Sequence, residues 1–116
     1  FETALEPGEL VTAVHFPKPD AAGYAKFANP ASRYAMVGVF VARFGGTVRV
    51  AVTGAGPSVF RVTAMEAALA ASFTPDAVAG ITVPADGLNS DMHASAEYRA
   101  HLVTVMAKRA MMQAVG

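Results

Sequence analysis

Residues 36–53, MVGVFVARFGGTVRVAVT, decide the fold class. Two runs rich in β-forming side chains, residues 36–43 and 47–53, flank Phe44-Gly45-Gly46. A Gly-Gly pair supplies the positive φ angles that a tight hairpin turn requires. The stretch therefore predicts an antiparallel β-hairpin.

Shorter strand signals lie on both sides of this hairpin. Residues 10–16 mix β-branched and apolar side chains between a Pro-Gly turn and Pro17, and they predict a first strand. Residues 23–28 predict a second strand that ends before Pro30, because proline biases the preceding residue away from helix. Residues 58–62 follow a glycine-rich turn and predict a short last strand. Together the strands predict an antiparallel meander.

Helical signals follow the strands. Residues 63–66, TAME, have the capping-box pattern, which predicts a helix that begins at Thr63. Residues 74–76, TPD, combine a capping hydroxyl, a first-position proline and an acid, and predict a short helix. From Ser95 onward, apolar side chains recur at helical spacing and predict a long amphipathic helix, with Tyr98, Leu102, Val105, Met106 and Met112 on one side. With residues 81–94 as a linker, we expect an α+β fold, an antiparallel β-meander packed against about three helices.

The amino-acid composition excludes several classes of partner and chemistry. Nine basic and nine acidic side chains cancel, so no net field favours nucleic acid or an anionic membrane as a partner. Charged residues make up 16% of the chain, against about 25% in typical soluble domains, which predicts that part of the surface contacts another protein. The chain has no cysteine, which excludes thiolate chemistry and fits a reducing compartment. Its longest apolar stretch, residues 34–44, is shorter than the ~20 residues of a membrane-spanning helix.

Few residues suggest chemistry of their own. The three histidines, His15, His93 and His101, lack metal-ligand spacing, so we expect no metal site and structural or solvent-facing histidines. No Gly-x-Ser-x-Gly elbow is present, and residues 54–56, GAG, predict a turn rather than a phosphate loop. Lys26 stands in an apolar short strand beside Phe27. Its ammonium either contacts a partner or is that of a solvated strand lysine, and composition alone favours the solvated lysine.

Four motifs in order give the chain a resemblance to a known family. They are TALEPGELVTAVHFP (residues 3–17), GYAKFANPASRYAMVGV (23–39), VAVTGAGP (50–57) and SAEYRAHLVTVMAKRA (95–110). Together they resemble the C-terminal domain of the FAD-binding medium subunit of the carbon monoxide dehydrogenase and xanthine dehydrogenase family, the molybdenum hydroxylases. The likeness covers nearly all of residues 1–116. It implies one CO dehydrogenase flavoprotein C-terminal domain, and we expect the FAD-binding domain to precede Phe1 in a longer protein.

The resemblance also implies a division of labour among subunits. In such enzymes the medium subunit carries FAD and passes electrons between it and 2Fe-2S clusters in a small subunit, while the molybdopterin cofactor lies in a large subunit. We therefore expect a domain of a cytoplasmic oxidoreductase that is inactive when isolated and has no catalytic residue of its own. The family's cofactor contacts fall on Val11 and Lys26, and a lysine near the flavin can stabilise the reduced ring or donate a hydrogen bond to a ring oxygen.

Two departures from the family pattern leave the substrate open. Asn29 stands where many relatives carry a basic residue, and Arg33 stands where others have small or acidic residues. The alternative hypothesis is a free-standing α+β interaction or ligand-binding module without redox work. Sequence upstream of Phe1 would discriminate the two, because only the first requires flavin-binding glycine-rich segments there.

Overall fold

The computed structural model describes residues 2–116 and contains one four-stranded antiparallel sheet in the order β1-β2-β3-β4. Its strands are β1 (Ala21–Ala28), β2 (Ala35–Phe44), β3 (Thr47–Thr53) and β4 (Phe60–Arg61). Its helices are α1 (Thr63–Ala71), the single-turn 3-10 helix η1 (Pro75–Val78) and α2 (Ala96–Val115). The expected α+β meander is confirmed, although one of the three expected helices is only a 3-10 turn.

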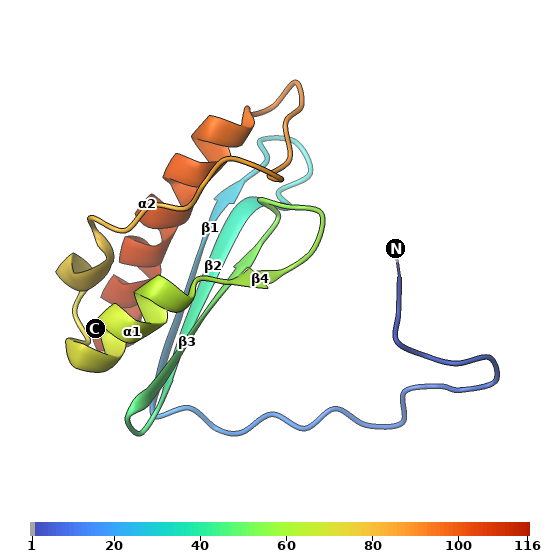
Figure 1. Cartoon of the computed structure of the whole chain (residues 1–116), viewed down its shortest axis with the longest axis horizontal. Helices are drawn as coiled ribbons and strands as arrows, with labels where there is room; N and C mark the ends of the chain where they lie inside the picture. Colours follow the sequence, from blue (N-terminus) through green and yellow to red (C-terminus); the bar gives the residue numbers. More distant parts are fainter. Residues whose placement is uncertain (1) are drawn as a thin grey trace.

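The helices cover one face of the sheet and leave the other face open (Figure 1). The covered face is built from β-branched residues at alternate positions, which point to one side of a strand. Val37, Val39 and Val41 of β2 are completely buried there, as are Val50 and Val52 of β3. The domain therefore has two layers, the sheet and the helices, with a single hydrophobic core between them.

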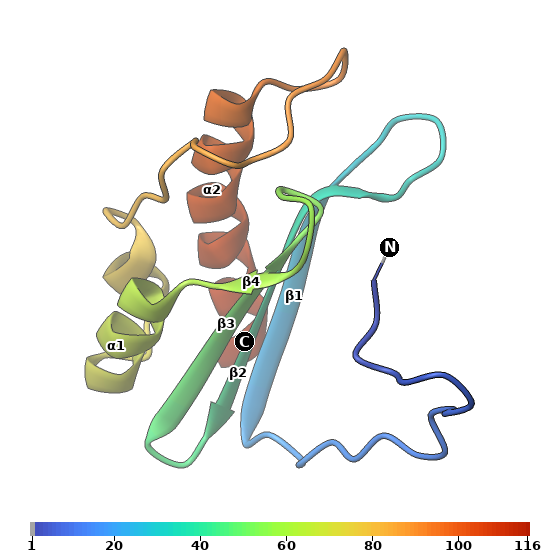
Figure 2. The ribbon, with the colours of Figure 1, turned by 45° about the vertical axis from the view of Figure 1, so that its right-hand side comes forward.

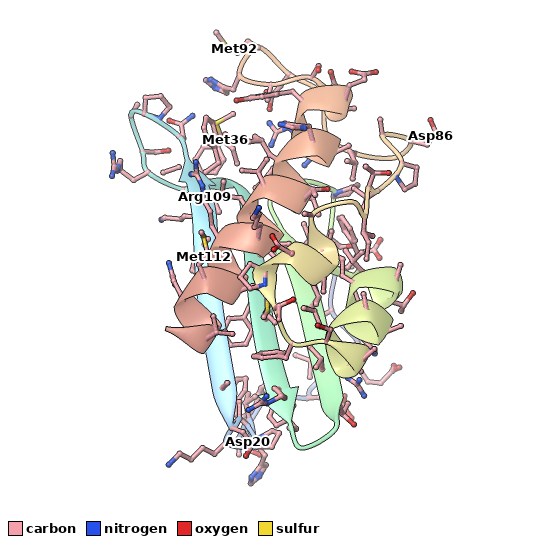
Figure 3. The ribbon with its side chains drawn as sticks, turned by 90° about the vertical axis from the view of Figure 1, so that its left-hand side faces the viewer. Asp20, Met36, Asp86, Met92, Arg109 and Met112 are labelled. Carbon is pink, nitrogen blue, oxygen red and sulfur yellow. The ribbon has the colours of Figure 1, made fainter. Side chains whose placement is uncertain are left out.

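Helix α2 lies directly on β1 and β2 (Figure 3). A Cβ atom on Gly23 would collide with the carbonyl oxygen of Ala110 and lie 2.8 Å from the nitrogen of Ala114. Glycine is therefore needed at this position, because the helix and strand backbones approach too closely for a side chain. The Phe27 and Tyr98 rings add an edge-to-face contact with centroids 6.1 Å apart.

The predicted first strand is wrong. Residues 10–16 have no regular secondary structure and lie in an extended N-terminal segment, residues 2–19. This segment runs away from the sheet on the side opposite the helices (Figures 1 and 2). A strand forms only where a neighbour accepts its backbone hydrogen bonds, and no segment among residues 2–116 pairs with residues 10–16. The predicted last strand is also shorter than expected and shrinks to the two residues of β4.

The predicted capping box at Thr63 forms no cap. Helix α1 does begin at Thr63, but its N-cap residue is Val62 and no side chain caps it. The Glu66 carboxylate instead accepts hydrogen bonds from the Val50 backbone N–H at 3.0 Å and from the Arg61 guanidinium at 2.6 and 2.8 Å. A buried strand N–H and a cation are stronger partners for this carboxylate than a solvent-accessible helix end.

The predicted start of α2 is confirmed, whereas its predicted apolar side is only partly right. The Ser95 hydroxyl accepts a hydrogen bond from the Tyr98 backbone N–H at 3.2 Å. Leu102 and Met106 are buried as expected, but Tyr98 and Met112 are 44% and 58% exposed. The helix buries a stripe turned toward Arg99 and Val103, because β1 and β2 lie under that side. The predicted linker, residues 81–94, contains no helix or strand.

Candidate functional site

The uncovered face of the sheet carries the candidate site. Alternate residues of β1 place Tyr24 and Lys26 on this face, and both are exposed. Strand pairing sets Tyr24 opposite Phe40, which is 44% exposed, and Lys26 opposite Gly38. Gly38 in turn pairs with Thr53 of β3. We call this set, Tyr24, Lys26, Gly38, Phe40 and Thr53, the open-face patch.

Gly38 gives the patch its shape. A Cβ atom at this position would lie 2.6 Å from the Tyr24 hydroxyl oxygen and 2.9 Å from the Thr53 Cγ2 methyl carbon. Both distances are too short for a real side chain, so the absence of one lets the Tyr24 ring lie across β2. The Tyr24 hydroxyl consequently lies over Gly38, which is the strand partner of Lys26.

The Lys26 ammonium is held in place by the turn that follows β1. Its Nζ atom donates a hydrogen bond to the Arg33 carbonyl oxygen at 2.7 Å. Arg33 has a φ of +67°, which is uncommon for a residue other than glycine. An ammonium group has three N–H donors. Lys26 therefore retains two donors for another acceptor on the open face. None of the salt bridges within residues 2–116 involves Lys26.

A buried asparagine builds this turn. The Asn29 side chain, 4% exposed, accepts hydrogen bonds from the Ala31 N–H at 2.9 Å and the Ser32 N–H at 3.2 Å. The Asn29 carbonyl accepts a further bond from the Arg33 N–H at 3.0 Å. Asn29, noted above as a departure from the family pattern, is thus the residue whose side chain closes the turn that positions Lys26.

Val11 and Lys26, the two cofactor contacts that the family resemblance implies, lie in different parts of the structure. Val11 is 63% exposed and belongs to the N-terminal segment, whereas Lys26 belongs to the sheet. Within this chain the two do not form one pocket. All three histidines are exposed, and residues 2–116 contain no group of three or more His, Cys, Asp or Glu side chains that could hold a metal ion. No helix in the same described range is long and apolar enough to cross a membrane.

Sequence reasoning missed Arg99, the most buried charged residue of the domain. Its side chain is 2% exposed and donates to the Met36 carbonyl at 2.7 Å, to the Gly54 carbonyl at 3.3 Å and to the Asp91 carboxylate at 2.9 Å. It thereby joins the first turn of α2 to β2, to the end of β3 and to the linker. The available signal was its spacing, because Arg99 shares a helix face with Val103 and Met106.

Backbone donors surround the carboxylate that faces Arg99. The His93 N–H donates to Asp91 at 2.9 Å and the Ala94 N–H at 3.2 Å. These bonds, His93 first, together with the Arg99 guanidinium, lower the pKa of Asp91 below its usual value. The linker is therefore fastened to α2 by an ionised carboxylate.

The fold and the open-face patch define a two-layer α+β domain in which one sheet face is covered by helices and the other is uncovered. A family model described as the CO dehydrogenase flavoprotein C-terminal domain matches residues 22–114, which is most of the chain. The chain belongs to this family and is a domain of an oxidoreductase flavoprotein whose full subunit is associated with FAD. No curated protein and no solved structure matches it.

Proposed function

We propose that the chain is the C-terminal domain of the FAD-binding medium subunit of a molybdenum hydroxylase, where it supports flavin electron transfer and subunit docking. The observation that carries the proposal is the open-face patch, in which a positioned lysine stands on an uncovered sheet face. The partners are the upstream FAD-binding domain, a large molybdopterin-containing subunit and a small subunit with 2Fe-2S clusters. The holoenzyme is a cytoplasmic oxidoreductase of the carbon monoxide and xanthine dehydrogenase type.

The residues of the patch fit a contact with one side of a flavin. Lys26 offers two free N–H donors, and Tyr24 and Phe40 offer exposed aromatic surface for a planar ring. One charge-assisted contact contributes only about 1.5–3 kcal/mol, while nanomolar binding needs about 12 kcal/mol. Most of the affinity for FAD must then come from another domain, and when bound the FAD supplies the electron-carrying chemistry.

In the proposed contact, Lys26 acts by holding a positive charge next to the flavin. The Arg33 carbonyl fixes the ammonium, so the charge is in position before the cofactor is reduced. A fixed cation stabilises negative charge on a reduced ring without a cost for reorienting solvent, and its free N–H groups can donate to a ring oxygen. Val11 reaches the same cofactor only if the N-terminal segment packs beside the open face.

The test is Lys26→Met in the full-length subunit of the assembled enzyme. We expect a loss of flavin affinity of about tenfold to a hundredfold, or an equivalent change in preference between oxidised and reduced flavin. Flavin content, flavin midpoint potential and acceptor-dependent turnover measure it. Hydroxylation with an artificial acceptor that takes electrons before the flavin should persist.

Lys108→Met is the matched control, because it removes the same charge from α2, on the helix side of the molecule. Lys26→Arg should retain part of the flavin affinity that Lys26→Met loses, since arginine keeps the positive charge. If flavin content, potential and turnover of Lys26→Met all equal those of the control, Lys26 is a solvated lysine and the proposed cofactor role fails.

A further inference from the structure

The N-terminal segment exposes an unusual density of apolar side chains. Leu10, Val11, Val14 and Phe16 are 73%, 63%, 66% and 85% exposed. Clustered apolar exposure of this kind marks interaction sites in soluble proteins. The hydrogen bonds that residues 3–9 make stay within the segment. Residues 9–16 thus have the composition of a strand without a strand's partner.

Extended geometry would divide these side chains between two faces. Successive side chains of a strand point to opposite sides, so Leu10, Val14 and Phe16 share one face with Thr12. Val11 and Ala13 lie on the opposite face with His15. Apolar residues on both faces are typical of a strand buried within a larger sheet, and Pro17 ends the run. The segment therefore fits a sheet that is covered on both sides.

The chain's own sheet does not offer such a place. On one side of the sheet, the two-residue β4 pairs with Ala51 and Val52 and leaves the rest of β3 without a strand. There the Val50 N–H is bonded to the Glu66 carboxylate and the Val50 carbonyl to the Val62 N–H. At the other edge, the Tyr24 N–H is bonded to the Gln113 side-chain oxygen of α2. Side chains from the two helices thus engage both edges at mid-strand. An incoming strand would have to displace them.

The start of β1 directs the segment toward the open side of the sheet. The Asp20 N–H donates to the Arg43 carbonyl at 2.8 Å, and the Asp20 carboxylate accepts from the Gly45 N–H. These bonds fix the chain at the end of the sheet where the β2–β3 turn lies, and Figure 3 shows Asp20 there. From this point the segment runs on the side opposite the helices (Figures 1 and 2). The family match begins at residue 22 and excludes the segment.

We infer that residues 9–16 add as a β-strand to an exposed sheet edge of the flavin-binding domain, and that this pairing brings that domain over the open-face patch. The identity of the partner rests on the proposed function. The partner edge must be flanked by apolar surface, because Leu10, Val14 and Phe16 need cover on one face and Val11 on the other. The pairing places Val11 in the same interface as Lys26, although the two lie apart in this chain.

Hydrogen exchange of the full-length subunit in its assembled enzyme tests the inference. Backbone amides of residues 9–16 should exchange at least about a hundredfold more slowly than those of residues 2–5, as expected for a hydrogen-bonded strand. Val11→Pro and Thr12→Pro are made separately. Neighbouring residues of a strand alternate in the direction of their N–H groups, so at least one variant removes a paired donor. That variant should abolish the protection of residues 9–16.

Two controls separate strand pairing from general damage. Ala4→Pro places the same residue outside the proposed strand and should leave the protection intact. Amides in the strands and helices of residues 22–114 should remain protected in every variant, because residues 9–16 take no part in the hydrophobic core or in the backbone hydrogen bonds described for residues 20–116. Loss of protection throughout the domain would mean that the segment supports the fold itself, and it would overturn the inference.

The other outcomes are equally decisive. Rapid exchange of residues 9–16 in the intact subunit overturns the inference, whatever the Lys26 variants show. Protection that appears only with a doubled mass and rises with concentration assigns the strand to a second copy and overturns the choice of partner. Protected residues 9–16 with unaltered flavin in Lys26→Met would leave the strand pairing intact and remove the proposed cofactor role.

Discussion

Replacing Arg99 by methionine should be the most destabilising single change in the polar framework of this domain. The guanidinium is 2% exposed and joins α2 to the Met36 and Gly54 carbonyls and to Asp91. Methionine keeps much of the aliphatic volume but leaves the two carbonyls without this donor. The effect is therefore a loss of hydrogen bonds and not mainly a cavity.

The magnitude follows from the geometry of these contacts. A buried group left without a partner costs about 1–3 kcal/mol. The 2.7 Å bond to Met36 is strong, while the 3.3 Å bond to Gly54 contributes less. The Arg99 Nε atom, which is buried without a partner among the described residues, is removed as well, and its removal offsets part of the loss. We expect a net cost of about 3 kcal/mol, equivalent to roughly 10–20 °C in Tm for a domain of this size.

Urea unfolding of the chain, followed by far-ultraviolet circular dichroism, measures the change. Arg109→Met is the matched control, because Arg109 is an exposed arginine on the same helix; its effect should stay within about 0.5 kcal/mol. The denaturant dependence of the free energy of unfolding should be the same in both variants, since the exposed area changes little. A midpoint for Arg99→Met equal to that of Arg109→Met would refute the proposed role of the guanidinium.

Two further predictions concern pH and helix caps. The pKa of Glu66 is lowered by its hydrogen bond from Arg61 first and from the Val50 N–H second, and that of Asp91 is lowered by backbone donors. Folded pKa values below the unfolded ones, about 3.9 for Asp and 4.3 for Glu, give stability that is present above those values and is lost as pH falls through the folded pKa. Urea midpoints should therefore decline below about pH 5, and the decline should be shallower in Glu66→Gln; an identical pH profile in that variant would contradict this origin. Ser95→Ala should cost about 1 kcal/mol because its hydroxyl caps α2, whereas Thr63→Ala should cost less because no side chain caps α1; thermal melts of the two variants with equal losses would show the cap assignment to be wrong.

Local patterns predicted much of the framework correctly. The alternating valines and the Gly45-Gly46 turn specify the β2–β3 hairpin, because both the period of two and the positive φ of Gly45 are properties of neighbouring residues. Ser95 marks the start of α2 for the same reason, since a cap acts within one helical turn. The order of strands and helices then limits the fold to a two-layer α+β arrangement.

The candidate site was predicted only in part. Lys26 was identified by family resemblance, and the strand pattern places it on a face of the sheet. Its hydrogen bond to Arg33 and the role of Asn29 were not predicted, because they depend on the path of the turn after β1. Tyr24 and Gly38 were not singled out at all, since their contact exists only once β1 and β2 pair in register.

The sequence by itself determined the hairpin, the long helix and the α+β class, since each follows from residues close together in the chain. Only the tertiary structure decided which partners the polar groups take. Glu66 accepts a hydrogen bond from the Val50 N–H of β3 instead of capping a helix. Arg99 donates to the carbonyl of Met36, 63 positions away in the sequence. Residues 10–16 have the side chains of a strand, yet the edges of the sheet are already engaged by Glu66 and Gln113. Strand propensity is local, but a strand also needs an edge to pair with, and that edge is a property of the folded chain.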